Sequence, residues 1–145
     1  MTRLSGHCMC GATTLTVAPA DQEIHACHCG MCRSWTSSAF MGLAVGPDDL
    51  VRQGPVRTRA TSDWAERAWC DACGSALWYR VTAPGPYSGT YHVAAGLFDG
   101  AAAFPMTGEL YIDQKPSGYA FAGNHTRYTE ADVQAMFAPD EGETP

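Results

Sequence analysis

Seven cysteines in three tight groups constrain this chain more than any other feature of its sequence. They form a Cys-x-Cys pair, a Cys-x-Cys-x-x-Cys triplet and a Cys-x-x-Cys-Gly pair: Cys8 and Cys10; Cys27, Cys29 and Cys32; Cys70 and Cys73. An odd number of closely spaced cysteines argues against a disulfide framework, whose cysteines are usually even in number and spread along the chain. Cysteines that are paired closely in sequence are typical of metal ligands. We therefore expect this chain to bind zinc.

The two outer pairs together have the composition of a closed, structural zinc site. On an extended chain, Cys8 and Cys10 present both thiols on the same face. Cys70 and Cys73 have the spacing of a zinc knuckle, and Gly74 relieves strain where the chain leaves the turn. A redox dithiol of this spacing is expected between a strand and a helix, whereas this pair lies between two strand-like segments. Spacing alone also allows this pair to join the middle triplet instead.

The middle triplet offers three thiols without a fourth cysteine. A zinc ion with three protein ligands keeps one position open for water or substrate, which is the arrangement of catalytic sites. Two alternatives remain open, namely that a histidine closes the site or that the thiols bind no metal. The histidines that are candidates to close it lie within the triplet and elsewhere in the sequence: His28, His25, His92 and His125.

Length, composition and charge favour a single globular domain. The 145 residues are 46% apolar and 17% charged, which is typical of a folded chain, and we expect one domain at 1–138 with a flexible acidic tail at 139–145. The net charge is −6 and Lys115 is the single lysine, so neither nucleic acid nor an anionic membrane is an expected partner. There is no apolar run of membrane-spanning length and no secretory signal near Met1. We therefore expect a cytoplasmic protein.

Glycines and prolines divide the chain into short segments, which favours a mainly β fold. Strands are expected at 13–17, 38–45, 56–61, 66–69, 76–81, 91–95 and 109–112, with a turn at 46–49 ending the second. The one helix expected begins after Thr129, where Asp132 completes a capping box, and ends before Pro139. The architecture predicted is a small β-sheet domain with a short C-terminal helix.

The cysteine motifs resemble those of a known family. They read Gly-His-Cys-Met-Cys-Gly-Ala at 6–12, Cys-His-Cys-Gly-Met-Cys-Arg at 27–33 and Cys-Asp-Ala-Cys-Gly at 70–74. Their order and spacing resemble the glutathione-dependent formaldehyde-activating enzyme family, which includes centromere protein V. The resemblance covers roughly residues 4–120.

This resemblance implies a small zinc-bound β-sheet fold and a division of labour among the cysteines. A structural zinc is implied on the outer pairs, Cys8, Cys10, Cys70 and Cys73. A second, catalytic zinc is implied on Cys27, Cys29 and Cys32, and glutathione could fill the open position of this second ion. The implied activity is that of a carbon–sulfur lyase, which forms S-hydroxymethylglutathione from formaldehyde and glutathione.

Residues near the triplet are candidates to contact this substrate. Glutathione carries two carboxylates, so Arg33 is the expected cationic contact, and Trp35 is expected to wall the pocket. His28 is expected to orient the site or relay a proton. Two other functions stay open: a non-catalytic zinc protein that binds glutathione or a partner, and a switch in which oxidised thiols release zinc.

Overall fold

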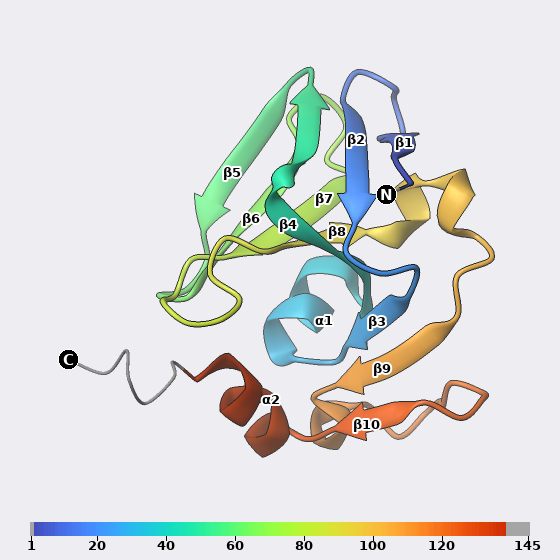
Figure 1. The fold of residues 1–145 in the computed structure, drawn as a ribbon, viewed down its shortest axis with the longest axis vertical. Coiled ribbons are helices and arrows are strands. Elements are labelled where there is room, and N and C mark those ends of the chain that lie inside the picture. The colour runs from blue at the N-terminus through green and yellow to red at the C-terminus, as the bar shows by residue number, and fades with distance from the viewer. Residues whose placement is uncertain (1, 139–145) are drawn as a thin grey trace.

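The computed structural model describes residues 2–138, and one ten-stranded sheet organises them (Figure 1). Eight strands follow the order β10-β9-β3-β4-β8-β7-β6-β5; β2 branches from β4, and β1 pairs with β2. The strand bounds are β1 (Leu4–His7), β2 (Thr14–Pro19), β3 (Ile24–Cys27), β4 (Phe40–Gln53), β5 (Val56–Ala60), β6 (Ala65–Cys70), β7 (Ala76–Val81), β8 (Tyr91–Ala94), β9 (Met106–Leu110) and β10 (Thr126–Tyr128). The predicted mainly β architecture with a short C-terminal helix is therefore confirmed.

The long strand β4 joins the two parts of the sheet. Its first half pairs with β3 on one edge and with β8 on the other, and its second half pairs with β2. The prediction that residues 46–49 end this strand is wrong. The β2–β4 register shifts between Val17 and Pro19, which accommodates the irregular stretch around Pro47, and pairing resumes at Leu50 opposite Val17.

The segment predicted as a strand at 109–112 is displaced toward the N-terminus. β9 ends at Leu110 because Tyr111 adopts a left-handed conformation with φ of 58°, and a 3-10 turn, η3 (Ile112–Gln114), follows. β9 pairs in parallel with β3 and with β10. Three strands of three or four residues, β1, β3 and β10, were not predicted.

Within residues 2–138, two α-helices lie outside the sheet, and only the second was predicted. α2 (Glu130–Phe137) begins at Thr129, which forms both hydrogen bonds of the expected capping box with Asp132. The helix ends at Phe137, whereas Pro139 and the tail predicted at 139–145 lie outside the described residues. α1 (Gly30–Thr36) lies against the sheet in the middle of the molecule (Figure 1).

The core lies where β2, β4, β7 and β8 contact one another. Its largest fully buried side chains are aromatic and aliphatic: Trp78, Leu15, Leu43, Leu77, Val17, Val45 and Val93. Short 3-10 turns, η1 (Ala95–Leu97) and η2 (Asp99–Ala101), add Phe98 to this core.

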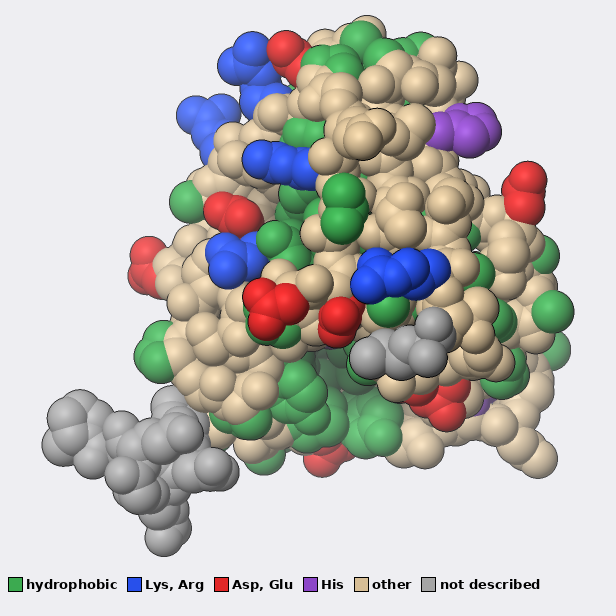
Figure 2. Space-filling model, turned by 45° about the horizontal axis from the view of Figure 1, so that its top comes forward, with side chains coloured by type: hydrophobic (Ala, Val, Ile, Leu, Met, Phe, Trp, Pro, Cys, Tyr) green, Lys and Arg blue, Asp and Glu red, His purple; other side chains and the backbone are tan. Residues whose placement is uncertain are grey.

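Within residues 2–138, no helix has the length and apolar character needed to cross a bilayer. On the face drawn in Figure 2, Lys and Arg side chains are interspersed with Asp and Glu side chains.

Candidate metal centres and substrate pocket

The fold brings the two outer cysteine pairs into one group. The Sγ atoms of Cys8, Cys10, Cys70 and Cys73 all lie within 4.8 Å of one another. The Sγ–Sγ distance is 3.6 Å between Cys8 and Cys10 and 4.0 Å between Cys10 and Cys70. A tetrahedral ion with Zn–S bonds of about 2.3 Å requires sulfur–sulfur distances of about 3.8 Å. The four thiols therefore fit a closed tetrahedral zinc site.

Two tight turns build this four-thiol group. The expectation that Cys8 and Cys10 lie on an extended chain is wrong, because the Gly11 N–H donates to the Cys8 carbonyl at 3.1 Å and closes a turn. Both thiols nevertheless reach the same point. The knuckle between β6 and β7 is as predicted: Gly74 has φ of 82°, and its N–H donates to the Cys70 carbonyl at 2.8 Å.

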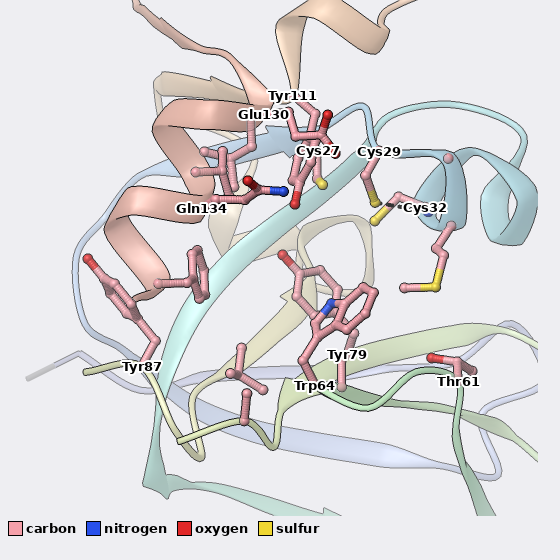
Figure 3. A pocket seen from close by; sticks show the side chains of 18 of the residues that line it. Cys27, Cys29, Cys32, Thr61, Trp64, Tyr79, Tyr87, Tyr111, Glu130 and Gln134 are labelled. Carbon is pink, nitrogen blue, oxygen red and sulfur yellow. Dashed lines mark hydrogen bonds between the residues drawn. The ribbon is translucent and has the colours of Figure 1, made fainter. Parts of the chain in front are cut away.

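The middle cysteines form a second group at the junction of β3 and α1. The Sγ atoms of Cys27, Cys29 and Cys32 lie within 4.8 Å of one another, on one wall of a pocket (Figure 3). Cys27 ends β3, and Cys29 is the N-cap of α1, where its Sγ accepts the Cys32 N–H at 3.4 Å. The cap residue and the third residue of the helix therefore face the same ion site. These three thiols fit zinc with one position left open.

The thiols of this group influence one another strongly. Hydrogen bonds from Cys27, then from Cys32, lower the pKa of Cys29 to about 2 in the metal-free protein, with the nearby Arg67 guanidinium adding to the effect. The hydrogen bond to Cys29 raises the pKa of Cys27. A thiolate is therefore favoured at one sulfur of the group, and the thiolate is the form that binds metal.

Arg67 on β6 supports this group from the sheet side. Its side chain is 5% exposed, and its Nη1 and Nη2 donate to Cys32 Sγ at 3.7 and 3.6 Å. The guanidinium lies over the rings of Trp35 at 4.8 Å and Tyr79 at 5.1 Å. Sequence reasoning missed Arg67, although strand alternation sets it on the same face as the buried Ala65.

His28, between two of the thiols, belongs to a different set of contacts. It is fully buried, and its Nε2 lies 2.7 Å from Glu109 Oε1 on β9. His125 Nε2 lies 2.5 Å from the other carboxylate oxygen, and Arg127 Nε lies 3.2 Å from the same oxygen. Burial alone would raise the pKa of Glu109, but the hydrogen bonds from His125 and His28 outweigh burial and lower it. This network fixes the backbone between Cys27 and Cys29.

The histidines considered as a fourth ligand have other neighbours. His28 and His125 share Glu109, His92 stacks on Tyr79 with ring centroids 4.4 Å apart, and His25 lies beside Asp21 and Glu23. Within residues 2–138, the three-thiol group includes no histidine. The arrangement is therefore that of an open rather than a closed three-cysteine site.

A pocket of about 940 Å³ opens in front of the three thiols. Figure 3 shows its layout, with Glu130 and Gln134 of α2 next to the cysteines along one side, and Tyr79 and Trp64 across the space from them. Trp35 lines this pocket as expected for a wall residue, whereas Arg33 does not line it. The Arg33 Nε instead donates to the His28 carbonyl at 3.1 Å.

Comparisons with known proteins identify the family. Residues 3–114 match the family described as glutathione-dependent formaldehyde-activating enzyme. The chain belongs to this family. It is also 31% identical, over 134 residues, to a Schizosaccharomyces pombe protein named "uncharacterized lyase C29B12.13", and the match covers 92% of this chain and 96% of the relative. The resemblance inferred from the cysteine motifs is therefore confirmed.

A solved structure shares the fold of this chain. The crystal structure of a Rhodobacter sphaeroides protein matches with a TM-score of 0.57 at 19% identity, and the match covers 72% of this chain and all of that protein. The family match ends at residue 114, whereas α2 begins at Glu130. One wall of the pocket therefore lies beyond the segment that matches the family.

Proposed function

We propose that this protein catalyses the reversible addition of a thiol to formaldehyde or a related small aldehyde, as a zinc-dependent carbon–sulfur lyase. The thiol is glutathione or another small thiol. The observation that carries the proposal is the three-thiol group at the pocket wall, with Sγ atoms within 4.8 Å and no histidine among the described residues of the group. Family membership and the lyase name of the yeast relative support the same reaction class.

The two cysteine groups divide the metal chemistry between them. Cys8, Cys10, Cys70 and Cys73 would hold a structural zinc, and Cys27, Cys29 and Cys32 would hold a second ion beside the pocket. A zinc ion in the open site would supply Lewis acidity, which lowers the pKa of a bound thiol and produces a nucleophile at neutral pH. The protein's own residues then bind and orient the two reactants.

The reaction itself needs no oxidant or reductant. The thiol sulfur forms a bond to the carbonyl carbon, the carbonyl π electrons move to oxygen, and that oxygen takes up the proton that the thiol loses. Arg67 is suited to stabilise the developing negative charge, because its guanidinium lines the pocket and its buried Nε has no hydrogen-bond partner among the described residues. The reverse reaction breaks the carbon–sulfur bond and returns thiol and aldehyde.

The test combines a metal count with an exchange rate, because thiols also add to formaldehyde without a catalyst. Zinc per chain is measured on native protein and on Cys29→Ser, and the thiol–adduct exchange rate is measured by NMR with each protein. We expect two zinc ions to fall to one, with the fold intact by circular dichroism, and the rate to fall to the uncatalysed value. Exchange that stays fast with Cys29→Ser would contradict the proposal.

The alternative function, a switch in which oxidised thiols release zinc, predicts a different behaviour of the same three cysteines. Cys29 is half-buried and lines the open pocket, so an oxidant can reach it. A protein that loses one zinc under mild peroxide, regains it with reductant and never accelerates adduct exchange would be a switch rather than a lyase.

A further inference from the structure

We propose that the thiol partner of this pocket is an uncharged thiol with an aromatic or aliphatic body, rather than glutathione with its two carboxylates. This inference rests on the proposed function of the same site. Four features of the pocket carry it: its size, its aromatic walls, the charges that line it and the wall formed by α2.

The pocket is far larger than formaldehyde requires. Its volume of about 940 Å³ lies at the upper end of the range for pockets that enclose a drug-sized molecule. Formaldehyde has two heavy atoms. The remaining space is therefore available to the body of the thiol, whose sulfur must lie at the three cysteines for the carbon–sulfur bond to form there.

Six aromatic side chains line this space: Trp35, Trp64, Tyr79, Tyr87, Tyr111 and Phe137. Two of them face water to an unusual degree for their size, since Trp64 is 54% exposed and Tyr87 is 40% exposed. The Tyr87 ring packs against Phe137 with centroids 4.8 Å apart, which extends the apolar surface onto α2. Such walls gain free energy by covering an apolar body and gain none by covering a carboxylate.

The charged side chains at the pocket do not suit an anion. Among the described lining residues they are Arg67 and Glu130. Arg67 is 5% exposed, its two terminal nitrogens donate to Cys32, and the proposed reaction uses its remaining Nε at the aldehyde oxygen, so no nitrogen of Arg67 is left for a glutathione carboxylate. Glu130 would repel a carboxylate. Arg33 and Lys115 contact backbone carbonyls and do not line the pocket. Two glutathione carboxylates would therefore lose water without gaining a cationic partner.

One wall of this apolar pocket, which lacks a free cation among its described lining residues, is formed by α2. Its pocket-facing residues are Glu130, Val133, Gln134 and Phe137, which recur at three- and four-residue intervals and so share one face of the helix. This helix lies beyond residues 3–114, which match the family. This wall lies outside the family match, although the alignment with the Schizosaccharomyces pombe relative, which covers 92% of this chain, reaches it. The residues of α2, rather than family membership, therefore decide which thiol fits this side of the pocket.

The first experiment measures binding without any reaction. The unreactive thioethers S-methylglutathione and methyl 2-phenylethyl sulfide are titrated against zinc-loaded protein, with tryptophan fluorescence as the readout, because Trp35 and Trp64 line the pocket. We expect the phenylethyl thioether to bind at least 10-fold more tightly. Equal or tighter binding of S-methylglutathione would overturn the inference.

The second experiment measures adduct exchange with formaldehyde for the parent thiols, glutathione and 2-phenylethanethiol. We expect kcat/KM above the uncatalysed reaction to be at least 10-fold higher for 2-phenylethanethiol. Faster turnover of glutathione would overturn the inference and leave the proposed lyase function standing. Tight binding of the phenylethyl thioether with no turnover of either thiol would support the inference on the pocket and contradict the proposed function.

A matched pair of lysine variants tests the role of charge directly. Gln134→Lys adds a cation to the pocket wall, whereas Ala135→Lys adds the same cation to an exposed position of α2 that does not line the pocket. We expect Gln134→Lys to raise affinity for S-methylglutathione at least 5-fold and Ala135→Lys to leave it unchanged. An equal response in both variants would mean that wall charge does not select the thiol.

Discussion

Replacing Arg67 with methionine removes the guanidinium that contacts the three-cysteine group while keeping an apolar side chain between the Trp35 and Tyr79 rings. The two N–H donors lie 3.6 and 3.7 Å from Cys32 Sγ. A hydrogen bond to a charged group contributes about 1.5–3 kcal/mol, and every 1.4 kcal/mol changes an affinity about 10-fold. We therefore expect Arg67→Met to weaken zinc binding at this group by about 10- to 100-fold.

The assay is competition between the protein and a chromophoric chelator, which resolves the weaker from the tighter of the two proposed zinc ions. Arg80→Met is the matched control, because Arg80 lies over the Tyr91 ring at 5.5 Å and 3.8 Å from Glu66 but donates no hydrogen bond to a cysteine. Melting temperatures of both variants are measured with the zinc sites loaded. Unchanged zinc affinity in Arg67→Met, or equal weakening in Arg80→Met, would refute the reasoning.

Three further perturbations test the rest of the structure. Cys73→Ser is expected to prevent stable folding, because structural zinc binding is coupled to folding, whereas Cys29→Ser stays folded; equal melting temperatures would contradict the division between the two groups. Glu109→Gln leaves two buried histidines without their carboxylate, and we expect a loss of about 3 kcal/mol in urea unfolding at pH 7. A loss below about 1 kcal/mol would mean that the network contributes little. Burial, together with the charge of His25, lowers the pKa of His92 to about 4, so the unfolded chain takes up a proton near pH 6.5 that the folded chain does not. Stability therefore falls as the pH drops below about 6.5, and His92→Phe should reduce the loss between pH 7 and 5.5 by about 1 kcal/mol. The same pH slope in both proteins would exclude this role of His92.

Local patterns predicted which cysteines could share a metal ion, and the fold brings them together in two groups. Cys70, Cys73 and Gly74 carry their geometry within five residues, and the capping box at Thr129 likewise depends on four consecutive residues. α1 was missed because it has only seven residues and a cysteine as its N-cap, where Ser, Thr, Asp or Asn usually signals a helix start.

Contacts between distant segments could not be predicted from such patterns. Glu109 meets His28 across 81 positions of sequence, and Arg67 meets Cys32 across 35. The pocket combines residues of β6, β7, α1 and α2, so its aromatic lining emerges only once the sheet has formed. The sequence pointed to Arg33 as the cation near the triplet, because Arg33 directly follows Cys32. The cation that reaches the thiols is Arg67, which lies on β6, and no motif in the sequence links it to the triplet.

The loop that carries the middle cysteines is held by bonds that do not involve a metal. β3 pairs with β9 up to Cys27, the Gly30 N–H donates to Gln114 Oε1 at 3.1 Å, and the His28 ring is hydrogen-bonded to Glu109. The entropy of ordering this loop is therefore lost when the chain folds and not when an ion arrives. We therefore expect the cysteine loop to keep its conformation when an ion at this site is removed, so that the metal can exchange without unfolding of the chain. Removal of an ion from the outer four thiols is expected to destabilise the fold instead.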